Sequence, residues 1–124
     1  MSSQAIILFA HGARDPEWAA PFGIIQRQLQ AARPDVQVEL AFQDFMRPTL
    51  DEAVAQSAAR GARRIVLVPL FMAQGGHLKQ DLPLLVGKIR EQHPQIELQV
   101  MPAIGDVPEI LQAITDWVLR GAVA

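Results

Sequence analysis

Cysteine is absent from the chain, and its absence narrows the chemistry that the protein can perform. Without a thiol there is no disulfide bond, no thiolate metal site and no cysteine nucleophile. An excess of positive charge is absent as well, because 11 lysine and arginine residues stand against 13 aspartate and glutamate residues, for a formal net charge of −2. A basic surface of the kind that binds nucleic acid is therefore not expected, and neither is a nucleic-acid partner.

Long apolar runs and several well-known motifs are also missing. The first apolar run is about six residues long, far short of the roughly 20 residues that a membrane-spanning helix needs. No positively charged segment of the kind that opens a signal peptide precedes it, so we expect a cytoplasmic protein that does not enter a membrane. The chain contains no Gly-x-Gly-x-x-Gly, no Walker loop, no Gly-x-Ser-x-Gly and no His-Glu-x-x-His. The enzyme classes that depend on these motifs are set aside.

Short apolar runs alternate with amphipathic stretches along the 124 residues. Continuous apolar runs at 5–9 and 65–68 are typical of strands buried on both faces, and alternating patterns at 36–42 and 96–101 indicate strands nearer the sheet edges. The order predicts a βαβαβαβα chain of the α/β class, with a Rossmann-like parallel four-stranded sheet inside a three-layer αβα arrangement. No linker or repeat divides the pattern, so we expect residues 1–124 to form one domain.

Candidate caps and apolar spacing place the helices. Thr49 and Glu52 fit a capping box, and Asp15, Asp81 and Asp106 are predicted to cap the first, third and fourth helices. The last helix is predicted from apolar residues at helical spacing. They are Val107, Ile110, Leu111, Ile114, Trp117 and Val118.

Two histidines come just after predicted strands. His11 follows the strand at 5–10, and His77 ends the segment 69–77 that follows the strand at 65–68. The carboxyl ends of parallel strands share one edge of a sheet, and ligands bind at that edge. Imidazole both moves protons near neutral pH and holds first-row transition metals. The pair therefore points to metal chemistry, although hydrogen-bonded structural histidines remain an open alternative from the residues alone.

Other side chains expected at this edge suit a large, flat, partly apolar ligand with acidic groups. The glycines among them either supply turns or let a ligand approach the backbone, and both alternatives stay open. Asp44 is either a turn residue or a functional acid. The candidate ligand-binding residues are Arg14, Arg47, Phe71, Met72, Gly75, Gly76 and Lys79.

Two stretches carry motifs of one protein family. The stretch Ile7–Pro16 resembles the opening of the sirohydrochlorin chelatases of CbiX type, and Pro69–Pro83, with its glycine-histidine and aspartate-x-proline, resembles their second motif. Between them, segments 41–44 and 47–50 look like the family's linking segment, although Asp44 stands where the family usually has glutamate. The resemblance runs from residue 5 to residue 117 and implies the class II chelatase fold in a short, single-domain form that works as a homodimer.

The resemblance implies insertion of a divalent metal into sirohydrochlorin, on the way to cobalamin or sirohaem. Cobalt is the expected metal, with iron or nickel as alternatives, and no organic cofactor is implied. His11 and His77 are then the metal-binding and catalytic residues, one of which takes a pyrrole proton. Arg14, Arg47 and Lys79 are candidates for binding the substrate's carboxylates. Two alternatives remain open: a non-catalytic carrier of metal or tetrapyrrole with the same cleft, and a structural domain with buried histidines.

Overall fold

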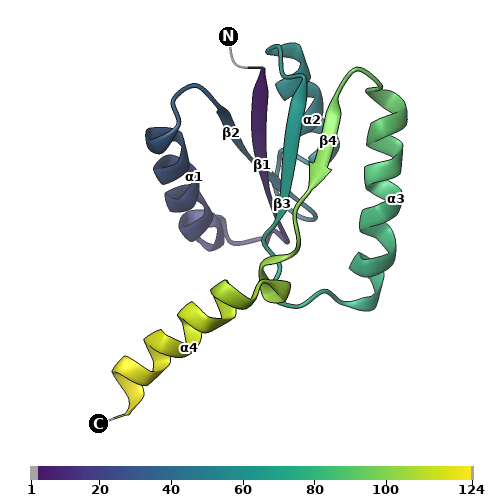
Figure 1. Ribbon diagram of the computed structural model, residues 1–124. Coiled ribbons are helices and arrows are strands. Elements are labelled where there is room, and N and C mark those ends of the chain that lie inside the picture. Colours follow the sequence, from purple (N-terminus) through teal and green to yellow (C-terminus); the bar gives the residue numbers. More distant parts are fainter. Residues whose placement is uncertain (1–2, 124) are drawn as a thin grey trace.

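The computed structural model of the protein describes residues 3–123, apart from the side chain of His77. Its single sheet is parallel and has the strand order β2-β1-β3-β4 (Figure 1). The predicted four-stranded parallel sheet is confirmed, with the continuously apolar strands in the centre and the alternating strands at the edges. The strands are β1 (Gln4–Ala10), β2 (Gln37–Phe42), β3 (Arg64–Pro69) and β4 (Glu97–Val100).

Helices follow each strand, as the alternating pattern predicts. The helix α1 lies on one side of the sheet, and α2 and α3 lie on the other (Figure 1). The last helix, α4, projects away from the sheet. The helices are η1 (Pro16–Ala19), α1 (Ala20–Ala32), α2 (Leu50–Ala59), α3 (Gly76–Gln92), η2 (Ile104–Asp106) and α4 (Pro108–Ala122), where η marks a 3-10 helix.

The main apolar core lies between the sheet and the pair α2 and α3. The same face of β1 and β3 contributes Ile7 and Leu67, which are fully buried, and α3 covers them with side chains such as Ile89. Burying one large aliphatic side chain contributes roughly 1.5–3 kcal/mol, so this layer holds the central strands and the two helices together. The predicted last helix is present as α4, and no residue of it is buried in the described chain.

Two of the four predicted helix caps are confirmed. Thr49 forms a capping box, because its hydroxyl accepts from the Glu52 N–H at 3.3 Å and the Glu52 carboxylate accepts from the Thr49 N–H at 3.0 Å. The Asp15 carboxylate accepts from the Glu17 N–H at 2.9 Å and caps the first helical turn.

The other two caps are wrong because the helices begin elsewhere. The N-cap of α3 is Gly75, which places Asp81 inside the helix and His77 in its first turn. Glycine is tolerated at an N-cap, so no carboxylate is needed there. Asp106 ends η2, and the N-cap of α4 is Val107, without a side-chain hydrogen bond.

The ion pair at the start of α2 makes a pH-dependent contribution to stability. Arg47 donates to the Glu52 carboxylate, and the Thr49 N–H adds a second donor; together they lower the pKa of Glu52 to about 2. A carboxylate with a lowered pKa stabilises the fold above its unfolded value, here 4.5, and this stabilisation is lost as the pH falls toward about 2. Glu52→Gln should therefore flatten the decline of the unfolding free energy over this range, as measured by urea denaturation at a series of pH values.

Glu91→Gln removes an exposed acid near the C-terminal end of α3 and serves as the control. It should leave the slope of unfolding free energy against pH unchanged. Asp35, whose pKa the hydrogen bond from Arg33 lowers to about 2, titrates in the same range in every variant. An unchanged slope in Glu52→Gln would show that the Arg47 pair has no energetic consequence.

Candidate active site at the carboxyl edge of the sheet

His11 directly follows β1 and is exposed at the carboxyl edge of the sheet. Its ring meets the ring of Phe71 edge-on, with the centroids 4.4 Å apart. Phe71 is fully buried and in turn meets Phe9, at 5.5 Å and nearly perpendicular. The aromatic pair thus supports the imidazole from beneath and leaves it open to solvent. The alternative of a histidine buried in the core is wrong for His11.

Gln43 sets the orientation of the imidazole. It follows β2, and its N–H donates to the carbonyl of Ala10 at 2.9 Å, so the pairing of β1 and β2 continues past the strand ends. Its side-chain Oε1 lies 3.2 Å from Nδ1 of His11. An amide oxygen only accepts, so the contact is a hydrogen bond in the tautomer with the proton on Nδ1, in which the lone pair is on Nε2. A neutral imidazole held in this way is a suitable metal ligand.

The loop after β2 approaches His11 closely because residue 12 is glycine. Gly12 has φ +85°, and a Cβ atom there would overlap the carbonyl oxygen of Asp44. The Asp44 N–H donates to the carbonyl of His11 at 2.9 Å. The structure therefore supports the conformational role for Gly12, because its positive φ and the nearby carbonyl leave no room for a side chain.

A cleft of about 460 Å³ opens beside Gln43, between the loop after β2 and α3. Carboxylates line it from both sides, Asp44 from the loop and Asp81 from the helix, with Lys88 further along α3. The remaining lining residues are apolar: Phe9, Leu78, Leu82, Leu84 and Leu85. Apolar walls with a few charged groups are typical of ligand sites, and the cleft has the size of one.

Sequence reasoning assigned no ligand-facing role to Gln43 or Asp81. Gln43 follows β2, and β2 lies beside β1 in the sheet. Once this strand order is known, a contact between Gln43 and His11 is expected, because each is the first residue after its strand. Asp81 was interpreted as a cap, although a helix that begins at Gly76 places it one turn after position 77 and along the cleft. A helix predicted to begin at Gly76 instead of after Asp81 would have indicated this position.

The predicted apolar and glycine residues lie along the segment between β3 and α3. Met72 is 53% exposed, whereas Phe71 is buried beneath His11. A Cβ atom at Gly75 or Gly76 would meet nothing within 4 Å, so protein packing does not require glycine there. Lys79 is exposed in the first turns of α3 and shares a cavity of about 250 Å³ with Met72 and Asp106.

The two predicted arginines have partners within the protein. The guanidinium of Arg14 lies 4.8 Å from the centroid of the Phe45 ring, a cation–π arrangement. Arg47 pairs with Glu52, which draws it toward the start of α2. Both arginines are exposed, so either one remains accessible to a ligand.

The side chain of His77 lies outside the described part of the structure. Its backbone lies in the first turn of α3, at the same edge of the sheet. Among the side chains that are described, no three of histidine, aspartate and glutamate are grouped so that they could hold a metal ion.

A family model with the description CbiX matches residues 5–120. The chain belongs to the CbiX family. A protein named sirohydrochlorin cobaltochelatase from Saccharolobus islandicus is 36% identical over 106 residues, which covers 81% of each chain. A protein of the same name from Methanococcus aeolicus is 32% identical over 91 residues, covering 73% of this chain and 64% of its own.

Solved structures share the fold. A CbiX protein from Marinobacter aquaeolei VT8 is 28% identical with a TM-score of 0.81, covering 94% of this chain and 95% of its own. SirB from Bacillus subtilis, solved with Fe³⁺, is 22% identical with a TM-score of 0.79. The match covers all of this chain but only 49% of SirB. The CbiX-family chain therefore has the fold of one half of SirB, and the predicted chelatase-like fold is confirmed.

Gln43→Leu tests the hydrogen bond that orients His11. Loss of the amide oxygen should release the preference for the proton on Nδ1, because the opposite tautomer then costs no hydrogen bond. The ¹⁵N chemical shifts of the two His11 ring nitrogens, which differ between tautomers, should move toward an average. Gln28→Leu, on the exposed surface of α1, is the matched control and should leave them unchanged. Unaltered shifts in Gln43→Leu would refute the proposed orientation.

Proposed function

We propose that this CbiX-family protein inserts a divalent metal ion, cobalt foremost, into sirohydrochlorin during the synthesis of cobalamin or sirohaem. The observation that carries the proposal is His11, exposed at the carboxyl edge and in contact with Gln43, which lines a cleft together with Asp44 and Asp81. The relative that is 36% identical carries the name sirohydrochlorin cobaltochelatase. Histidine and carboxylate groups also bind iron and nickel, which are alternative metal substrates.

Metal insertion requires a ligand that holds the ion while sites stay open for the ring nitrogens, and groups that accept the pyrrole protons. We assign the first role to Nε2 of His11, with His77 as a second ligand from the start of α3. The carboxylates of Asp44 and Asp81 line the neighbouring cleft and are exposed, so they are available to accept protons or to hold the ion. Gln43 accepts from Nδ1 of His11 in the tautomer that leaves the Nε2 lone pair for the ion.

Side chains around this edge suit a substrate rich in carboxylates. Arg14 and Lys79 are exposed cations that follow His11 and His77, respectively, by three and two positions. Arg47 becomes available if a substrate carboxylate replaces Glu52. Met72 supplies an exposed apolar wall. Gly75 and Gly76 leave open space along the backbone, which lets a flat ring approach closely.

We further propose that the chain forms one domain and acts as a homodimer. The supporting observation is that it matches about half of each SirB chain, 49% in one structure and 52% in another. Two copies of this chain would thus correspond in length to one SirB chain. A cytoplasmic location is part of the same proposal; within residues 3–123, no helix is long and apolar enough to cross a membrane.

Single replacements of the two histidines test the activity. His11→Ala and His77→Ala should each slow Co²⁺ insertion by at least about 100-fold, because each removes a group that binds the metal or accepts a proton. The rate is followed by the change in the absorption spectrum of sirohydrochlorin. His93→Ala, at the opposite end of α3, is the control and should retain the rate.

Full activity of both variants would refute the assignment of the site. Saturable binding of cobalt and sirohydrochlorin by the unmodified protein, without faster insertion, would instead identify a carrier with the same cleft.

A further inference from the structure

One residue of the loop after β2 has a backbone conformation that its side chain disfavours. Phe45 has φ +67°, in the left-handed region that bulky side chains rarely adopt. The Met46 N–H donates to the carbonyl of Asp44 at 2.8 Å, so residues 44–46 form a three-residue turn around Phe45. A turn with this hydrogen bond and a positive central φ is the rare, strained form of the γ-turn. Glycine at position 45 would make the same turn without the strain.

Neighbouring contacts hold the turn in place. The Asp44 N–H donates to the carbonyl of His11 at 2.9 Å, and the Asp44 carbonyl lies so close to Gly12 that a Cβ atom there would overlap it. At the other end of the loop, the Phe42 N–H donates to the carbonyl of Pro48 at 2.9 Å. A strained residue persists only when its surroundings leave no alternative, and such residues concentrate at functional sites.

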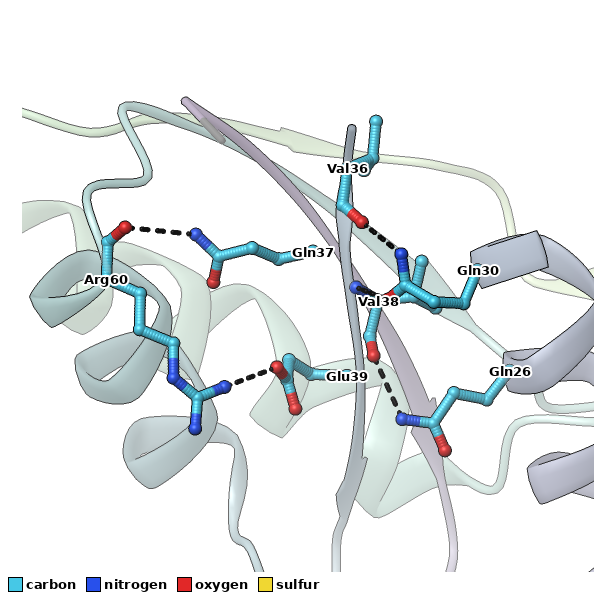
Figure 2. Close-up of polar contacts among 7 residues, drawn as sticks. All are labelled: Gln26, Gln30, Val36, Gln37, Val38, Glu39 and Arg60. Atoms are coloured by element: carbon cyan, nitrogen blue, oxygen red, sulfur yellow. Dashed lines mark hydrogen bonds and ion pairs between the residues drawn. The ribbon is translucent and has the colours of Figure 1, made fainter. Parts of the chain in front are cut away.

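The strand that carries this loop is fixed on both of its edges. The strand β2 pairs with β1 on one edge, and side chains of α1 bind its other edge (Figure 2). Gln30 donates to the carbonyl of Val36 at 2.7 Å and accepts from the Val38 N–H at 3.2 Å. Gln26 donates to the carbonyl of Val38 at 2.9 Å. A shift of β2 along the sheet would break these hydrogen bonds, so the strand does not relieve the strain at Phe45 by moving.

Burial does not account for the phenylalanine either. Phe45 is 65% exposed, so only a small part of its apolar area is removed from water. Its ring contacts Arg14, whose guanidinium carbon lies 4.8 Å from the ring centroid. Arg14 follows His11 by three positions. The ring thus connects the loop that carries His11 with the loop after β2.

The Phe45 ring, and not a carboxylate, holds Arg14. Among the side chains that the structure describes, none forms an ion pair or a hydrogen bond with Arg14. The contact with the ring occupies none of the guanidinium N–H groups in a hydrogen bond to oxygen. These donors are therefore available to a carboxylate, which a guanidinium binds through two parallel N–H groups.

The two arginines at this edge of the sheet differ in this respect. Arg47 is paired with Glu52 and must give up that partner before it binds another carboxylate. Arg14 has no such partner to give up, and its charge is exposed. Of these two cations, Arg14 is therefore the one that is ready to bind an acidic ligand.

We propose that Phe45 is a positioning residue, whose ring holds the Arg14 guanidinium where it binds a carboxylate of the tetrapyrrole. This inference rests on the proposed function, which supplies sirohydrochlorin as the ligand, and it adds Phe45 to the residues that the sequence predicts for ligand binding. A free arginine side chain loses rotamer freedom when it binds a ligand, and that loss weakens affinity. The ring restricts Arg14 before the substrate arrives, so less freedom is lost on binding.

Binding of metal-free sirohydrochlorin tests the inference, in a titration at low salt followed by its absorption spectrum. Arg14→Gln should weaken binding about tenfold, because it removes a charge-assisted hydrogen bond. Phe45→Asn removes the ring but keeps a residue that tolerates a positive φ. It should weaken binding about fivefold, the fold-change that corresponds to a cation–π contact at an exposed site. Phe45→Tyr keeps the ring and should bind as tightly as the unmodified protein.

The double variant Arg14→Gln with Phe45→Asn separates positioning from direct contact with the substrate. If Phe45 acts through Arg14, the double variant should bind about tenfold more weakly, as Arg14→Gln does alone. A loss of about fiftyfold, the product of the two single effects, would overturn the inference, because Phe45 would then contribute without Arg14. Unchanged binding in Phe45→Asn would overturn it as well.

Two exposed positions on α1 supply matched controls. Arg27→Gln removes a charge and Ile24→Asn removes an apolar side chain, and both should leave binding unchanged. Phe45→Gly guards against a folding defect, because glycine relieves the strain of the turn. It should reproduce the weaker binding of Phe45→Asn without a lower unfolding temperature. Full binding by Phe45→Gly would contradict the inference.

The kinetics of cobalt insertion distinguish this inference from the proposed function. In Phe45→Asn the KM for sirohydrochlorin should rise about fivefold while kcat is unchanged, because the groups that bind the metal are untouched. If the unmodified protein inserts cobalt and Phe45→Asn keeps its KM, the inference alone is wrong. If the variants bind sirohydrochlorin in the predicted pattern but the unmodified protein inserts no metal, the chelatase activity alone is wrong.

Discussion

The parallel pairing of β1 with both β2 and β3 is the constraint on which the rest of the structure depends. In this register Ala10 lies beside Phe42, and Phe9 lies beside both Ala41 and Pro69. The three strands therefore end at the same level, and the residues that follow them meet at one edge. His11 after β1, Gln43 after β2 and Phe71 after β3 come into contact for this reason. The buried layer between the sheet and the helices α2 and α3 holds the strands in that register.

Much of the fold could be predicted because its signals are local. The apolar run at 65–68 and the alternation at 36–42 distinguish a central from an edge strand through burial on two faces or one. The Thr49 capping box depends on residues three positions apart, which the chain places together before any long-range contact forms. The strand-end position of His11 follows from the same local pattern. Its exposure and its contacts do not.

The two wrong helix caps share a physical cause, which is that each helix begins at another residue than its local sequence predicts. Asp81 has the chemistry of a cap, yet the backbone after β3 becomes helical at Gly76 and places that carboxylate along the cleft. The apolar spacing of α4 was correctly interpreted as an amphipathic helix. Spacing identifies the face to be buried but not the surface that buries it, and the close contact of Gly105 in η2 with the Met72 carbonyl directs α4 away from its own sheet.

The sequence by itself determined the order of the strands and helices, the two histidine motifs and the membership of the CbiX family, because each depends on residue identity and short spacings. Only the tertiary structure decided which groups surround His11, since Gln43 and Phe71 are distant in the chain and meet through strand pairing. It also decided that Gly12 must be glycine, because the neighbour that excludes a side chain is a backbone carbonyl from another loop. The exposure of the apolar residues of α4 likewise emerges only in three dimensions, where it depends on every other element.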